Sequence, residues 1–252
     1  MPLKGWDFQI NYGIKTGFND AFIINGEKRR ELIDIDSKSE EIIRPILRGR
    51  DIKRYGYEYQ DLWLIATFPS LKIDIENYQA VKQHLLSFGY DRLKQTGGEN
   101  ARKKTNNQWF ETQDSISYWE DFNKQKIVWG NLNLGATYSL AEPGMFINAP
   151  CSLITPSEKY LLAILNSKAA DYYIRSLGVT RNGGYFEYKP MFIEKLPIPV
   201  LSEQNKKTLN DLVDRITLTT SISQKKKYEE EIDSYVFDLY ALSKEDIELL
   251  NT

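Results

Sequence analysis

The chain has 252 residues, of which 41% are apolar, so it is long enough to bury one large core, and its net charge is −2. A single Cys and a single His exclude a disulfide framework, a Cys/His zinc site and a Ser-His or Cys-His triad with a spare His. No stretch approaches 18 apolar residues, and the composition predicts a cytoplasmic protein without a membrane partner.

Acidic side chains are concentrated in the last fifth of the chain. Residues 203–252 contain eleven acidic and seven basic residues, a net charge of −4, which leaves +2 for residues 1–202. The body is therefore close to neutral, and any affinity for the phosphates of DNA must come from local clusters of cations.

Residues 8–25 predict two extended segments around a turn that contains Gly13 and Gly17. Such a turn allows a partner to approach the backbone closely. Its polar side chains could each reach a phosphate or a base edge; they are Lys15, Thr16 and Asn19. A plain hairpin with polar tips is the alternative.

Residues 44–54 place five basic side chains within eleven residues. Pro45 breaks any helix that runs in from the preceding acidic residues, and Gly49 allows a turn. The cations predicted on this turn and its flanks are Arg48, Arg50, Lys53 and Arg54. They would bind phosphates or base edges, or else form a solvated loop with ion pairs through Asp51.

The next part of the chain predicts a buried strand at 61–68 and a helix at 77–88, in which His84 is expected to be an ordinary structural or surface residue. Residues 96–107 form the most loop-like run, because Gly, Asn and cations dominate and no apolar periodicity survives. A basic loop beside aromatic residues suits a nucleic-acid surface, although such loops also simply cover an aromatic core. Its candidate contacts are Arg102, Lys103 and Lys104.

Short apolar runs between residues 127 and 155 alternate with Gly, Asn and Pro, which predicts several β-strands. We expect them at 127–129, 137–140, 145–147 and 152–154. Cys151 lies in this run and is expected to be a buried side chain without chemistry, since no base is near it. Ser157 is expected to cap a helix that continues to Leu165, and another helix is expected at 168–177.

A polar, glycine-bearing loop at 180–189 precedes the proline-rich segment Leu196-Pro-Ile-Pro199. The candidate contacts in the loop are Arg181, Asn182 and Tyr185. The two X-Pro pairs force an extended path, and we place a boundary here, with a domain at 1–200 and a C-terminal helical hairpin region at 201–252. Two amphipathic stripes predict the hairpin, and Ser243 is expected to open a last short helix with a capping box. The fold class is thus α+β, a mixed α/β body with several short β-strands followed by the hairpin.

Motifs for catalysis are scarce in this sequence. It contains no Gly-x-Gly-x-x-Gly, no P-loop and no Asn/Asp-Pro-Pro-Tyr/Phe tetrapeptide of the kind that holds the target amino group in DNA amino-methyltransferases. Glu187-Tyr-Lys189 matches the Glu-x-Lys half of a metal-dependent nuclease site, which also needs an upstream Asp on a neighbouring strand. Asp171, the nearest candidate, falls in a predicted helix.

Six segments in a fixed order resemble the TaqI-like C-terminal specificity domain of type IIG restriction-modification enzymes and related adenine-specific DNA methyltransferases. They are Gly13-Ile-Lys-Thr-Gly-Phe-Asn-Asp-Ala-Phe22, Ile46-Leu-Arg-Gly-Arg-Asp-Ile-Lys-Arg-Tyr55, Leu62-Trp-Leu-Ile65, Lys126-Ile-Val-Trp129, Ile164-Leu-Asn-Ser-Lys168 and Leu196-Pro-Ile-Pro199. The resemblance implies that this chain reads double-stranded DNA, while a separate methyltransferase domain or subunit binds S-adenosylmethionine and modifies adenine. The resemblance implies that this chain is either a fragment of a larger enzyme or a separate specificity chain. Because it lacks the cofactor-binding and catalytic motifs of the full enzymes, we expect no cofactor and no catalysis for this chain alone.

The sequence therefore predicts a DNA target recognition domain that inserts loops into the major groove. A segment shared by proteins that recognise different sites is expected to build the scaffold or grip phosphates, so base reading is assigned to the loops at 96–107 and 180–188. Two alternatives remain open. One is a metal-dependent DNA-cleaving enzyme that uses Glu187 and Lys189, and the other is a protein-interaction module without DNA contact.

Overall fold

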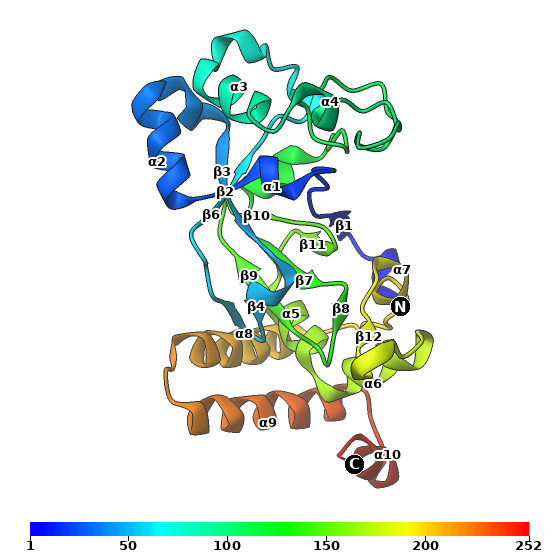
Figure 1. Ribbon diagram of the computed structural model, residues 1–252. Coiled ribbons are helices and arrows are strands. Elements are labelled where there is room, and N and C mark those ends of the chain that lie inside the picture. The colour runs from blue at the N-terminus through cyan, green and yellow to red at the C-terminus, as the bar shows by residue number, and fades with distance from the viewer. Residues whose placement is uncertain (252) are drawn as a thin grey trace.

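A computed structural model describes residues 1–251 and confirms the α+β class. Two four-stranded sheets occupy the middle of the molecule. Figure 1 shows one group of helices above the sheets, with α2, α3 and α4, and another below them, with α5, α8 and α9. No helix in the described part of the chain is both long enough and apolar enough to cross a membrane.

The first sheet is antiparallel with strand order β1-β11-β7-β9. The second has the order β10-β3-β6-β2, in which only the β10–β3 pair is parallel. Two small sheets pair β12 with β8 and β4 with β5. The strands are β1 (Gln9–Tyr12), β2 (Ile23–Asn25), β3 (Ile43–Leu47), β4 (Ile52–Lys53), β5 (Gly56–Tyr57), β6 (Leu62–Ile65), β7 (Lys126–Gly130), β8 (Leu132–Asn133), β9 (Tyr138–Ala141), β10 (Phe146–Ile147), β11 (Cys151–Thr155) and β12 (Phe186–Glu187).

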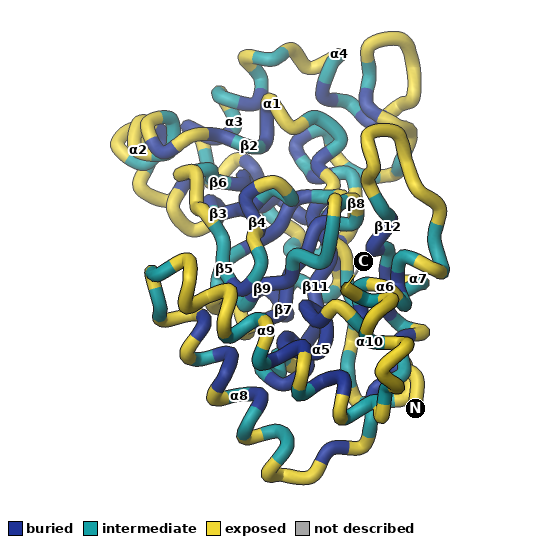
Figure 2. Tube along the Cα trace, turned by 90° about the horizontal axis from the view of Figure 1, so that it is seen from below, coloured by how far each residue is buried: buried dark blue, intermediate teal, exposed yellow. Residues whose placement is uncertain are grey.

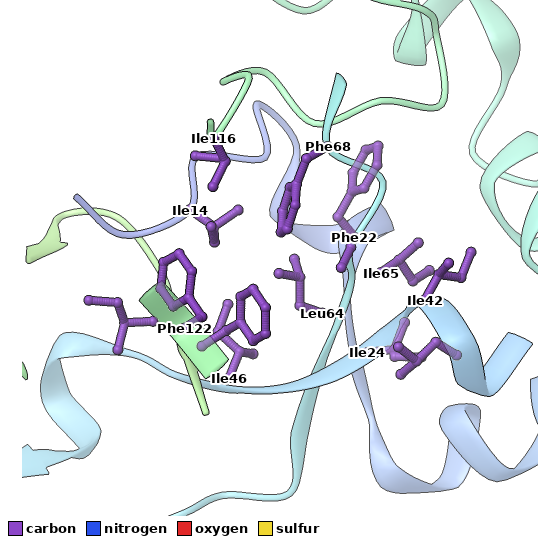
Figure 3. Close-up of a cluster of buried hydrophobic side chains, with 14 of the residues drawn as sticks. Ile14, Phe22, Ile24, Ile42, Ile46, Leu64, Ile65, Phe68, Ile116 and Phe122 are labelled. Carbon is purple, nitrogen blue, oxygen red and sulfur yellow. The ribbon is translucent and has the colours of Figure 1, made fainter. Parts of the chain in front are cut away.

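The first sheet separates two hydrophobic cores, because successive side chains of a strand point to opposite faces. Val128 and its cross-strand partner Leu153 belong to the core on the side of α2 and α3, which we call the upper core. Ile127 and its partner Ile154 belong to the core on the side of α5, α8 and α9, which we call the lower core. Figure 3 shows part of the upper core, where Ile14, Phe68 and Phe122 converge. Figure 2 shows buried residues running through β7, β9 and α5 between the exposed outer turns of the helices.

The helices cover the outer sides of both cores. Residues of α8 and α9, among them Leu209, Val213 and Ile232, are buried in the lower core with α5. The predicted C-terminal hairpin is therefore confirmed, and it shares a core with the body; the boundary after residue 200 stays a prediction. The helices are α1 (Asn19–Phe22), α2 (Gly26–Ile35), α3 (Gln79–Leu86), α4 (Tyr90–Leu93), α5 (Lys159–Asn166), α6 (Lys168–Leu177), α7 (Pro190–Ile193), α8 (Glu203–Leu218), α9 (Ile222–Leu239) and α10 (Lys244–Leu250). Ser243 caps α10 in a capping box, as predicted.

The two extended segments predicted within residues 8–25 are present as β1 and β2. The alternative of a plain hairpin is wrong, since β1 pairs with β11 and β2 pairs with β6 in the other sheet. One further local prediction is also wrong. Ser157 does not cap α5, because its hydroxyl bonds to Gln125 and Glu158 occupies the cap position. Pro45, expected only to end a helix, lies within β3 opposite Trp63.

Candidate nucleic-acid interface

Four strands from both large sheets end at the same place in the molecule. Gly13, just after β1, donates its N–H to Cys151 (2.8 Å), and Ile14 donates to Ile147 at the end of β10 (2.7 Å). Asn148 in turn donates to Leu47 at the end of β3 (2.8 Å). β7 joins them, because its last residue, Gly130, pairs with Cys151. The segments that leave these strands therefore lie side by side.

The segments pass close to one another at Gly13 and at Gly49, and glycine is required at Gly13. A Cβ atom on Gly13 would lie 2.8 Å from the backbone of Asn148, closer than any side chain tolerates. Gly49, in the basic turn, has the backbone of Gly130 opposite it, at 3.6 Å from the position of a Cβ atom. The basic turn is thus held against the end of β7.

The two-stranded sheet of β8 and β12 brings the loop at 180–187 next to these segments. β12 pairs with β8, which follows directly after β7, and Tyr188 donates its N–H to Asn131 (2.9 Å). The indole of Trp129 donates to the carbonyl oxygen of Tyr188 (2.7 Å), and the Tyr188 hydroxyl bonds to Asp171 on α6. We call residues 13–19, 48–51, 131–137, 148–150 and 180–187 the loop edge.

Two hollows open on the loop edge, and Pro150 lines both. The first, about 470 Å³, lies between the 13–19 segment and Asn148–Pro150. The second, about 610 Å³, lies between Asn131–Leu132 and the 180–189 loop. Amide side chains line both hollows, and amides can donate to and accept from base edges.

Lys15 and Arg50 are exposed cations of the loop edge that form no ion pair with any described residue. Arg48 is tied to the buried carboxylate of Asp51, with Nε–Oδ2 at 2.9 Å and Nη2–Oδ1 at 2.8 Å. Burial opposes ionisation of Asp51, but hydrogen bonds from Arg48 outweigh it and lower the pKa of this carboxyl. The alternative of ion pairs through Asp51 thus holds for Arg48 and not for Arg50.

Arg181 is exposed and is held by Glu187, whose carboxylate is buried. The Arg181 Nε–H donates to Glu187 Oε1 (2.6 Å), and Lys189 Nζ lies 3.0 Å from the same oxygen. Hydrogen bonds from these two cations, of which the one from Lys189 has the larger effect, hold the pKa of the Glu187 carboxyl below its usual range. Asn182 and Tyr185, in the same loop, are also exposed.

Two predicted contacts are not on the surface, and their assignment is corrected. Arg102 is only 1% exposed, because the irregular segments around it leave carbonyl groups that need donors. Its guanidinium donates to the carbonyl oxygens of Leu93, Thr16, Glu111 and Trp109, and burial lowers its pKa to about 10. Thr16 is also 1% exposed. Its hydroxyl donates to Asn19 Oδ1 (2.7 Å) and accepts from the N–H of Phe18 (3.1 Å).

The basic stretch is divided between two parts of the molecule. Arg54 points to α9, where its Nε lies 3.4 Å from Glu229, and its Nη2 donates to the carbonyl of Asn166 at the end of α5. Its assignment as a DNA contact is therefore corrected to a structural one. Lys53 is exposed in the β4–β5 hairpin and donates to the Arg50 carbonyl (2.8 Å). Lys103 and Lys104 are exposed in the 96–107 loop, next to the 13–19 segment through Arg102.

Sequence reasoning missed the amides of Asn131 and Asn148 and the role of Glu187 as the partner of Arg181. An amide directly after a buried strand is the signal that could have found the first two. Glu187 does not gather with other carboxylates. Within residues 1–251, no group of three Asp, Glu, His or Cys side chains could hold a metal ion, and Asp171 binds Tyr188 and Arg175 instead.

Comparisons with known proteins agree with the fold. Residues 44–198 match the family described as the TaqI-like C-terminal specificity domain. The type II methyltransferase M.BstVI of Geobacillus stearothermophilus is 23% identical over 248 residues, which cover 96% of this chain and 40% of that protein. This chain thus spans less than half of that relative.

Two solved structures share the fold. The type IIL restriction-modification enzyme MmeI, solved in complex with DNA, superposes with a TM-score of 0.68 at 14% identity, over 96% of this chain and 33% of that chain. The type IIG restriction endonuclease BpuSI gives a TM-score of 0.50 at 16% identity, over 94% of this chain and 31% of that one.

Proposed function

This chain belongs to the TaqI-like C-terminal specificity domain family, and we propose that it recognises a specific sequence in double-stranded DNA for a restriction-modification enzyme. The observation that carries the proposal is the loop edge, where three of the five segments present the exposed cations Lys15, Arg50 and Arg181 beside amide-lined hollows. Cations that form no ion pair with a described residue, such as Lys15 and Arg50, are suited to contact phosphates. Amide side chains, and a cation that an ion pair fixes in place, such as Arg181, are suited to contact base edges.

The chemistry on DNA belongs, in this proposal, to a methyltransferase domain or subunit that binds S-adenosylmethionine and modifies adenine. The similarity to M.BstVI supports it, since this chain matches 40% of that methyltransferase and the rest of that protein lies outside the match. Glu187 is already engaged by two cations, which favours a positioning role over a metal site.

Binding of the full chain to short labelled duplexes, followed as salt rises from 50 to 200 mM, tests the proposal. A domain that grips phosphates should lose affinity steeply, with a slope of about −0.9 for each phosphate neutralised. A selection from random duplexes should then enrich one sequence. No binding at the lowest salt would favour the protein-interaction alternative instead, and metal-dependent nicking that Glu187→Ala abolishes would favour the nuclease.

A further inference from the structure

We propose that Arg181 reads a guanine of the target sequence and that Glu187 positions it for this contact. The inference rests on the proposed function and specifies one of its base contacts. It starts from the way in which Arg181 is held.

Glu187 occupies only one edge of the Arg181 guanidinium. The carboxylate oxygen Oε1 contacts Nε at 2.6 Å and also Nη2. A guanidinium has five N–H groups in a planar fork, so the second N–H of Nη2 and both N–H groups of Nη1 remain. The two that point away from the side-chain stem, one on each terminal nitrogen, are parallel donors. They match a pair of acceptors set side by side.

The support under this fork is buried and hydrogen-bonded. Glu187 is 6% exposed, lies in β12 opposite Leu132 of β8, and precedes Tyr188, which is 1% exposed and anchored to Asp171. The loop folds back on itself, because Arg181 donates its N–H to the carbonyl oxygen of Tyr185 (2.7 Å). A held arginine loses less side-chain entropy on binding than a free one, so a single geometry can be selected.

The charge of the cluster selects acceptors. Arg181 and Lys189 together carry two positive charges against the single carboxylate of Glu187, so the hollow that all three line keeps a net positive charge. Guanine presents two acceptors in the major groove, O6 and N7, whereas adenine presents an acceptor and an amino donor that would face the N–H groups. A phosphate also offers paired acceptors. The two sources therefore share one chemistry and must be separated by experiment.

Arg50 differs from Arg181 because no carboxylate of a described residue holds its guanidinium in place. It is exposed and has no carboxylate partner among the described residues, so its side chain is free to follow a phosphate. Arg50→Ala is therefore the matched control, since it removes the same group from the same face.

Selection of bound sequences from a random duplex library, with the full chain, shows whether Arg181 contacts a guanine or a phosphate. The wild type should select one sequence. Arg181→Ala should keep that sequence except at one position, where the preference for guanine falls by about 5-fold to 150-fold. Arg50→Ala should keep every preference and weaken binding to all sequences alike.

Glu187→Gln separates positioning from simple damage to the fold. Removal of this negative charge should leave overall affinity for DNA unchanged or higher, while the guanine preference falls at the same position as in Arg181→Ala. A structural defect would lower affinity instead.

The outcomes distinguish this inference from the function on which it rests. If the wild type selects no sequence, the proposed function fails and the inference fails with it. If the wild type selects a sequence and Arg181→Ala preserves it at every position, whether affinity is unchanged or uniformly weaker, only the inference is overturned; uniform weakening would make Arg181 a phosphate contact.

Discussion

The guanidinium of Arg102 donates a 2.8 Å hydrogen bond to the carbonyl oxygen of Thr16, so two residues that the sequence places on DNA-facing loops are bonded to each other inside the protein. The bond joins the 96–107 loop to the first segment of the loop edge. The polar loop is thus built around a buried cation.

Arg102→Met should lower the free energy of unfolding by about 3 kcal/mol, because it removes the donor from four carbonyl groups, two in buried and two in partly buried hydrogen bonds. Urea denaturation measures the loss. The neighbouring Lys103→Met, at an exposed position, should stay within about 0.5 kcal/mol of the wild type. Equal small effects of both substitutions would contradict a structural role for Arg102.

Arg54→Ala should reduce stability by about 1 kcal/mol, since it removes a partly exposed pair with Glu229 and a hydrogen bond to Asn166. Affinity for duplex DNA should hardly change, because Arg54 points to α9 rather than to the loop edge. Lys53→Ala, one residue earlier and exposed, is the control and should leave stability unchanged. A loss of DNA affinity without a loss of stability in Arg54→Ala would show that its DNA assignment was right.

Lys15→Ala and Arg50→Ala should each weaken binding to all duplexes alike. Each should also make the slope of log affinity against log salt less negative by about 0.9, the value for one phosphate contact. Arg30→Ala is the control, since Arg30 is an exposed arginine on α2, on the opposite side of the molecule from β8 and β12 (Figure 1). The same change of slope in Arg30→Ala would mean that overall charge, and not the loop edge, sets the affinity.

Lys126 should make stability depend on pH above 8. Its ammonium is fully buried against the carbonyl oxygens of Phe122, Lys124 and Glu142, and burial lowers its pKa from 10.5 to about 8. Between pH 8 and 10.5 the unfolded chain keeps a proton that the folded chain has released, so the free energy of unfolding rises with pH.

The variant Lys126→Met isolates this effect, because all other titrations are common to both proteins. Relative to the variant, the wild type should gain at most about 1.4 kcal/mol per pH unit between pH 8 and 10. Denaturation curves at several pH values check it. Parallel pH profiles of the two proteins would show that Lys126 keeps its ordinary pKa.

Elements with a strong local pattern could be predicted from the sequence. The stripes of α8 and α9 and the apolar runs of β7 and β11 need no distant partner to be recognised. α2 was missed because only Leu32 among its larger apolar side chains is fully buried, which leaves a weak periodicity. β8 and β12 have two residues each and exist through their pairing, so neither shows in a local window.

The site was predictable only in part, for a related reason. Lys15, Arg50 and Arg181 lie in glycine-bearing turns between apolar runs, and this signal led to the loop edge. Whether a cation in such a turn points outward depends on carbonyls and carboxylates far along the chain. Arg102 donates to the carbonyl of Thr16, 86 residues away, and Arg54 pairs with Glu229. No local sequence pattern indicates either partner.

The loop edge is joined largely by backbone hydrogen bonds, such as Ala149 N–H to Ile14 and Asn131 N–H to Pro150, both 2.9 Å. Such bonds do not depend on which side chains the segments carry. Apart from Gly13, the exposed positions can therefore diverge at little cost in stability, so the chemistry of this surface can change without a new fold.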